Sequence, residues 1–233
     1  MEKLTRQKVI ELSKGTGDIS GVDLSGMNLS GLDVIAVNFK GTNLKGANLS
    51  SANFSMSDFE GADLSGCNLS SSNFTGANFR SAQIEQSDLT FASFVGGDFS
   101  GATLRGTNFT NSKISFAEFA GADLSEANLQ MTEAVLIKGN SAVFRKVKLF
   151  GSSMIGADLS GADLRGAMLH GTDLSGANLS SADCRDASFI ETILWATNLT
   201  NADLRGATMS GVDMLRVKLE GAKIDSTDGL KAI

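Results

Sequence analysis

Residues 156–180 read GADLSGADLRGAMLHGTDLSGANLS, with a leucine at every fifth place. Asp or Asn stands before most of these leucines, and Ala or Thr stands one place earlier. A period of five matches neither an α-helix, which repeats every 3.6 residues, nor a β-strand, which repeats every two. The stretch therefore predicts a repeat structure whose unit is five residues long.

The repeat extends over nearly the whole chain of 233 residues. We call the leucine place the central position. Central residues follow one another in phase from Ile19 to Ile224, which makes 42 positions. Two places before them 20 repeats have Ala, and one place before them 26 have Asp or Asn. A phase kept over this length indicates a single repeat domain.

The phenylalanines show a second period, of twenty residues. Two columns of central positions hold most of them: Phe39, Phe59, Phe79, Phe99 and Phe119, and then Phe54, Phe74 and Phe94. Like residues at this spacing indicate a coil of four five-residue sides, with coils stacked at the strand spacing of about 4.8 Å. The sequence thus predicts a rod of about 10.5 coils and roughly 50 Å.

Each position of a side has a predicted place. The central residue and the small residue two before it point inward, and the residues next to the central one point outward. Asp or Asn before the central residue bonds nearby backbone, and Gly or Ser two places after it forms a corner. The chain has no proline, which would remove a backbone donor from the stack.

These motifs resemble the pentapeptide repeat family, whose motif is A(D/N)LXX. Residues 157–161, ADLSG, and 202–206, ADLRG, are examples, and the resemblance covers about residues 17–226. It implies an all-β fold, a right-handed quadrilateral parallel β-helix, or β-solenoid. The family includes DNA mimics that bind gyrase and confer quinolone resistance, a regulator of cyanobacterial differentiation, thylakoid-lumen proteins and secreted effectors. The resemblance is therefore specific for the fold and weakly informative about function.

The N-terminal end of the repeat needs a cover, because an open solenoid end exposes apolar side chains and unpaired backbone groups. Residues 4–14 are rich in helix formers, and Gly15 is a natural stop. We expect a short capping helix within residues 1–15, with a loose amphipathic tail as the alternative.

The repeat itself is expected over residues 16–228, followed by a tail at 229–233. This tail is too short for a second capping helix. Either Leu230 and Ile233 cover the last coil, or this end pairs with a second molecule.

The motif fails once, and we expect an irregular coil near residues 130–145. The central residues Ala134 and Gly139 are too small to fill the interior, although the phase is kept. One interpretation is a distorted coil in which Leu136 or Ile137 turns inward. The other is a protruding surface segment that contacts a partner.

No pattern for catalysis or metal binding is present in the sequence. His170 is the only histidine and is predicted at an exposed place, while Cys67 and Cys184 are predicted to be buried, inert thiols. The regularly spaced Asp residues suit turns better than a calcium loop, and no phosphate-binding loop motif occurs. We expect no enzyme activity and no cofactor. An enzyme site at 130–150 is the alternative, but no nucleophile–base pair can be named for it.

One predicted surface feature is a ladder of alternating charges. An acid column before the central positions and a basic column after them repeat every twenty residues on the same side. The ladder residues are Asp163, Asp183, Asp203, Arg145, Arg165, Arg185 and Arg205. Exposed ion pairs contribute about 0–1 kcal/mol each, so a solvated, neutralised surface is the plainer interpretation.

A second predicted feature is an acidic face that could mimic DNA. Residues 16–130 have a net charge of −7, whereas residues 131–233 have −1. The candidate acids are Asp18, Asp58, Asp98, Asp23, Asp63 and Asp123, with Asn and other residues between them. A duplex of similar length carries about 30 charges, so the match in net charge is poor.

The third predicted feature is an exposed apolar cluster toward the C-terminus. Its residues are Ile155, Trp195, Leu215, Ile193, Phe150 and Ile190. Exposed apolar patches commonly mark contacts, and Trp is enriched at interaction hot spots. A patch covered by the C-terminal tail is the alternative.

The sequence predicts a non-enzymatic protein-interaction scaffold. The expected partner is an unidentified protein or a second copy of the chain, and the alternative is a DNA mimic that binds gyrase. The net charge of −6 argues against direct binding of nucleic acid, and no apolar run is long enough for a membrane span. We expect a bacterial, cytoplasmic protein. A thylakoid-lumen or periplasmic location would require a targeting peptide that had been removed.

Overall fold

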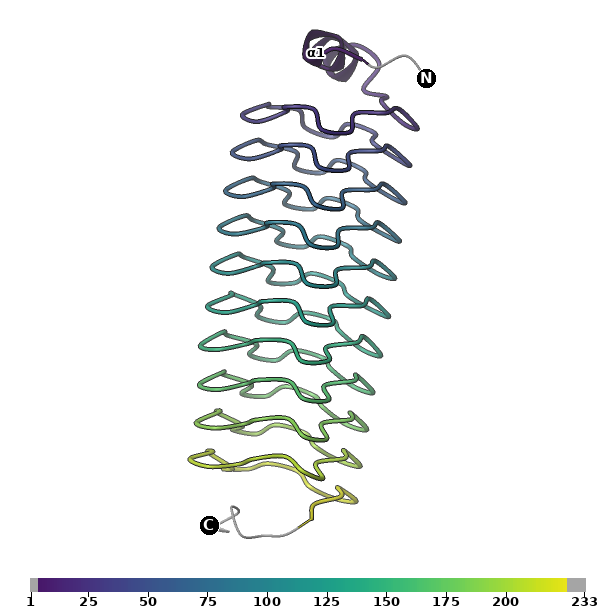
Figure 1. Cartoon of the computed structure of the whole chain (residues 1–233). Coiled ribbons are helices and arrows are strands. Elements are labelled where there is room, and N and C mark those ends of the chain that lie inside the picture. The colour runs from purple at the N-terminus through teal and green to yellow at the C-terminus, as the bar shows by residue number, and fades with distance from the viewer. Residues whose placement is uncertain (1–3, 226–233) are drawn as a thin grey trace.

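The computed structural model describes residues 4–225, which form one helix and a stack of similar coils (Figure 1). The helix α1 spans Arg6–Lys14 and lies at the N-terminal end of the stack. Each coil is joined to the next by parallel bridges between residues twenty apart, from Asp18 with Asn38 to Asp203 with Lys223. The predicted coil of four five-residue sides is confirmed.

Backbone hydrogen bonds run along the stack on every side. The N–H of a central residue donates to the next coil, as from Leu24 to the carbonyl of Asn43 at 2.7 Å. The N–H of Asn43 in turn donates to the carbonyl of Val22 in the previous coil at 2.9 Å. Because each coil bonds only to its neighbours, the stack is a solenoid.

The corners are tight turns that fix one residue in the left-handed conformation. The N–H of Thr42 donates to the carbonyl of Phe39 at 3.1 Å, and between them Gly41 has φ +60°. This is the pattern of a type II turn, which favours glycine at its third residue. Larger residues also occupy that turn position, Phe91 and Phe116 among them, with φ of 58° and 63°.

The core is a column of stacked side chains along the axis. Successive rings from Phe39 to Phe119 lie 4.8 to 5.0 Å apart and within 7° of parallel. The second column, starting at Phe54, packs edge-on against the first. The small residues two places before the centre are buried too, and buried hydroxyls among them bond back to the previous coil, as from Ser72 to the carbonyl of Leu49.

Residues 130–145 are not irregular in their backbone, so that expectation is wrong. Their bridges and turns continue those of the neighbouring coils. The difference lies in how the interior is filled. A Cβ on Gly139 would come within 2.9 Å of Leu159 and 3.1 Å of Phe144, so these neighbours occupy its space. Ile137 points inward and is buried at the place two before the centre, where the neighbouring coils have Ala117 and Ala157, whereas Leu136 is exposed.

Helix α1 covers the first coil. Thr5 caps its N-terminus by accepting a hydrogen bond from the backbone N–H of Lys8, and Val9 is fully buried. The guanidinium of Arg6 donates to the carbonyls of Asn28 and Ser30 at 2.8 and 2.9 Å. These carbonyls belong to the first coil, so Arg6 satisfies acceptors on the open edge of the stack. The predicted cover by Leu230 and Ile233 lies outside the described residues.

Candidate interaction surface

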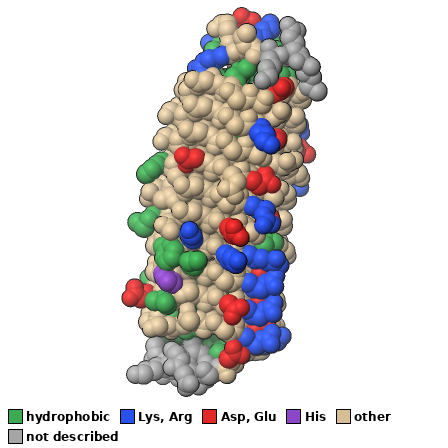
Figure 2. Space-filling model, viewed as in Figure 1, with side chains coloured by type: hydrophobic (Ala, Val, Ile, Leu, Met, Phe, Trp, Pro, Cys, Tyr) green, Lys and Arg blue, Asp and Glu red, His purple; other side chains and the backbone are tan. Residues whose placement is uncertain are grey.

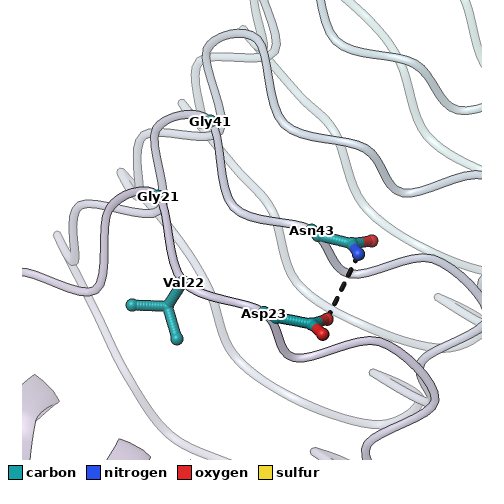
Figure 3. A pocket seen from close by; sticks show the side chains of 5 residues that line it. All are labelled: Gly21, Val22, Asp23, Gly41 and Asn43. Atoms are coloured by element: carbon teal, nitrogen blue, oxygen red, sulfur yellow. Dashed lines mark hydrogen bonds between the residues drawn. The ribbon is translucent and has the colours of Figure 1, made fainter. Parts of the chain in front are cut away.

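The described residues contain no cluster of three His, Cys, Asp or Glu that could hold a metal ion. The hollows on the rod are shallow. One of about 420 Å³ is lined by Gly21, Val22, Asp23, Gly41 and Asn43 near the N-terminal end (Figure 3). Its polar side chains bond each other, with the Asn43 amide donating to Asp23 at 3.1 Å. These groups do not form a nucleophile–base pair of the kind that catalysis needs.

Both thiols are buried. The Sγ of Cys67 lies 2.9 Å from the carbonyl of Leu44, and burial raises the pKa of this thiol to about 12. Burial also raises the pKa of the Cys184 thiol. A thiol that stays protonated at neutral pH is a poor nucleophile, so both cysteines act as small core residues.

The single histidine is half-buried rather than exposed as predicted. The ring of His170 meets that of Phe150 edge-on at 4.9 Å, and its Nε2 lies 2.6 Å from the hydroxyl of Ser188. The imidazole therefore packs as part of the surface, with both its apolar edge and its polar atom in contact.

The charge ladder is assembled by bidentate pairs. Arg165, Arg185 and Arg205 each donate two hydrogen bonds to the carboxylate two residues earlier, at 2.6 to 2.9 Å. Arg145 reaches down to Asp163 in the next coil at 2.5 Å. We call this edge of the rod, at residues 145, 165, 185 and 205, the ladder corner. Acidic and basic side chains stack along it in Figure 2.

The ladder is electrostatically satisfied within the chain. The guanidinium of Arg165, with help from Arg145, lowers the pKa of Asp163 to about 2. Arg205 lowers the pKa of Asp203 to about 2 in the same way. Hydrogen bonding to these carboxylates also raises the pKa of Arg165, Arg185 and Arg205. Charges that are already paired leave little for a partner to gain.

Half of the acids on the candidate acidic face form ion pairs within the chain. Asp58, Asp98 and Asp123 form ion pairs with Lys40, Arg80 and Arg105 respectively, at 3.0 to 3.3 Å. The remaining carboxylates act mainly in turns, as Asp18 accepts from the N–H of Ser20 and Asp63 from that of Ser65. Asn or Gln separates most of these acids along the stack, so the face is not a continuous anionic array.

The predicted apolar cluster lies on one side of the rod. Ile155, Ile193, Trp195 and Leu215 are exposed, while Phe150 and Ile190 are half-buried. Trp195 is 42 % exposed, and the guanidinium of Arg216 lies 5.9 Å from its ring centre. This spacing suits a cation–π contact.

The structure adds exposed side chains outside the predicted cluster, among them Leu136, which one interpretation of residues 130–145 turned inward. They are Ile35, Met56, Phe91, Phe116, Met131 and Leu136. Five of the six stand two places after a central residue, at the left-handed corner position, where the repeat motif predicts Gly or Ser. Their large size at a place reserved for small residues was the signal that could have found them.

All ten large hydrophobic residues that are exposed within 4–225 belong to the same side. One edge of this side, corner A, consists of residues 35 and 36 and the equivalent pair in each following coil, twenty residues further on, as far as 215 and 216. The other edge, corner B, consists of residues 30 and 31 and the equivalent pair in each following coil, as far as 210 and 211. We call the surface from corner B to corner A the apolar side. In Figure 2 hydrophobic side chains gather around the single histidine, at the edge opposite the ladder.

Glycines of the following coil make room for these side chains. A Cβ on Gly151 would lie 2.8 Å from the sulfur of Met131, and one on Gly156 would lie 2.8 Å from Leu136 Cδ2. The exposed side chains of Met131 and Leu136 thus pack over the glycine of the next coil, so apolar surface continues from one coil to the next.

The chain is similar to several solved structures. HetL, a protein involved in heterocyst differentiation regulation in the cyanobacterium Nostoc, matches 98 % of this chain and 99 % of its own at 22 % identity and a TM-score of 0.73. QnrB1, a plasmid-mediated fluoroquinolone resistance protein, matches 83 % and 94 % at 20 % identity and a TM-score of 0.40. A thylakoid-lumen protein of Arabidopsis thaliana matches 48 % and 68 % at 32 % identity and a TM-score of 0.21.

No curated protein matches the chain. No helix in the described part of the chain is long and apolar enough to cross a membrane. The family described as pentapeptide repeats matches in eight copies, over residues 18–55, 52–90, 92–130, 142–180 and 182–224. The interval left between 130 and 142 is where the motif fails. Solved members of this family are right-handed quadrilateral β-helices. The chain therefore belongs to the pentapeptide repeat family.

Proposed function

We propose that the protein is a non-enzymatic interaction scaffold that binds a protein partner through its apolar side. The observation that carries this proposal is the gathering of every large exposed hydrophobic residue of 4–225 on that side. Proteins of this family are in general structural or interaction proteins. A filled solenoid offers rigid faces rather than a concave site, which supports binding over catalysis.

The chemistry of the apolar side fits a protein partner. Exposed apolar patches of this kind commonly mark interaction sites, and Trp is enriched among residues that dominate binding energy. Trp195 lies at corner A with Ile155 and Leu215 in the same column. The rigid backbone beneath them means that little ordering entropy is lost on binding.

Capture from an extract of the source cell tests the proposal. The immobilised protein is compared with a Trp195→Glu variant and with Ser180→Glu, a control at the equivalent turn position of another corner. We expect a specific protein to be captured by the wild type and the control and lost with Trp195→Glu. Equal capture by all three would contradict the proposal.

A DNA mimic acting on a type II topoisomerase is the second candidate. Its support is the net charge of −7 over residues 16–130. It ranks lower because three of the six candidate acids are paired with cations of the same chain. A gyrase supercoiling assay with and without a quinolone tests it, and no effect at micromolar protein would remove it.

The proposed compartment is the cytoplasm of a bacterium. Its support is the cysteine usage of the sequence, since two cysteines 117 positions apart do not make the disulfide framework typical of small secreted proteins. Cell fractionation with an antibody against the protein tests the location, and recovery from the periplasm or another compartment would contradict it.

A further inference from the structure

Corner A differs from the other corners in its composition. Seven of the ten exposed large hydrophobic residues stand there: Ile35, Met56, Phe116, Leu136, Ile155, Trp195 and Leu215. Its remaining residues are Ala, Ser, Thr, Val or Gly, with the single exception of Arg216. Charged residues are depleted at the centre of protein interfaces, so corner A has the composition of a contact surface.

The order of these side chains along corner A is symmetric. Its ten residue pairs mirror one another about the gap between the fifth and the sixth. Reading outward from that gap, the matched apolar residues are Phe116 with Leu136, Val95 with Ile155, Met56 with Trp195, and Ile35 with Leu215. The third and eighth pairs match as well, because both have only Thr or Ser beside a glycine.

We propose that the protein forms a homodimer in which corner A of one copy packs along corner A of a second, antiparallel copy. The two-fold axis passes between the fifth and sixth pairs. In such an isologous interface, if one residue contacts another across it, the reverse contact also occurs. The mirrored order places large residues against large ones and small against small. This inference rests on the proposed function and names a second copy as the partner.

Charges beside corner A agree with the same axis. Lys113 and Glu133 stand on the apolar side in the coils of the fifth and sixth pairs. They are bridge neighbours in one chain, and no ion pair joins them among the described residues. The two-fold axis brings Lys113 opposite Glu133 of the second copy, twice per dimer. The unfavourable match, Asp33 with Asp213, falls at the far ends, where solvent screens it.

Corner A offers a long line of contact. Ten coils at strand spacing span about 48 Å. A strip roughly 12 Å wide centred on corner A, which leaves corner B outside the contact, gives about 600 Å² per copy, the low end of standard interfaces. The rod is nearly straight (Figure 1), so the two corners can remain in register along this length.

The first test measures mass in solution by sedimentation or light scattering. We expect the wild type at twice the chain mass of 24.3 kDa. Phe116→Glu, next to the axis, should raise the dissociation constant by about 100-fold, because it removes a central contact twice. Glu126 already occupies the same turn position in this chain, so the fold should tolerate the change.

Phe91→Glu is the matched control. Phe91 stands on corner B at the same turn position, with φ 58° against 63° for Phe116, and is 65 % exposed against 56 %. It should leave the dimer intact. A monomeric wild type, or equal dissociation by both variants, would overturn the proposal.

The second test checks the antiparallel register. Trp195→Glu and Met56→Lys should each give monomers, and the double variant should form dimers again through two new Glu–Lys pairs. The two positions are seven coils apart in one chain, so contact between chains is what can restore the dimer. Circular dichroism should show the same fold in all variants. A double variant that stays monomeric overturns the proposed pairing.

The two proposals fail separately. A monomeric wild type that still captures a protein through Trp195 would overturn the homodimer and leave the scaffold proposal standing. A dimer whose cell extract yields no further protein would support the homodimer alone.

Discussion

Corner A and the ladder corner are built on the same backbone and carry opposite surfaces. Both are stacks of turns closed by the same hydrogen bond, as at Ala157 with Met154 and at Ala167 with Leu164. One displays apolar side chains and a single charged residue, and the other displays arginines and aspartates that pair with each other. The comparison teaches that the fold is determined by inward positions, while outward positions are free to vary.

The largest expected effect comes from the interior that both corners share. Phe79 is fully buried and stacks at 5.0 and 4.8 Å between Phe59 and Phe99. Phe79→Ala should lower the free energy of unfolding by about 3–5 kcal/mol, as measured by urea denaturation. The exposed Phe91→Ala should change it by about 0.5 kcal/mol or less. Similar losses for the two variants would show that the inward positions do not carry the stability.

A smaller effect should distinguish the turns of the two corners. Gly156 on corner A and Gly166 on the ladder corner both have φ +65°. Alanine at either place should cost about 1–2 kcal/mol of unfolding free energy, because the left-handed conformation disfavours a Cβ. Gly156→Ala should also displace Leu136, whose Cδ2 would lie 2.8 Å from the new carbon.

Only Gly156→Ala should therefore weaken self-association, as sedimentation would measure. If Gly166→Ala weakens it equally, the distinction between the two corners is wrong.

The smallest expected effect is the pH dependence of the ladder corner. The pKa of Asp163 is about 2 in the folded chain and 3.8 as its ordinary value. Since folding lowers the pKa, its contribution to stability is present above pH 4 and is lost as the pH falls through 2. Asp163→Asn should flatten the change in urea midpoint across this window.

Ser175→Ala on corner A, which has no carboxylate, should leave this slope unchanged. An Asp163→Asn variant with the slope of the wild type would show that the ladder does not contribute to acid stability.

The fold could be predicted from the sequence because its interior repeats. The phenylalanines at intervals of twenty gave the coil size, and their rings do stack at about one strand spacing. The filling at Gly139 could not be predicted in this way. It depends on Leu159 of the next coil and on Phe144 of the next side, whose positions around Gly139 are set only in three dimensions.

The surfaces were less predictable. The ladder follows from the twenty-residue period, but the bidentate pairing of Arg165 with Asp163 within one coil does not, because side-chain direction decides it. Phe116 was missed because the motif assigns its position to a small turn residue. The contact of Arg6 with the first coil was missed because no pattern links a helix side chain to distant carbonyls.

The bonding of each coil to its neighbours alone has a consequence for how such a chain can evolve. A duplication or deletion of twenty residues would keep the remaining coils in phase for bridging, so coil stacking itself places no limit on length. In the proposed homodimer it would shift the midpoint of corner A and bring unlike side chains together. Selection on assembly, rather than on folding, would then hold the number of turns constant.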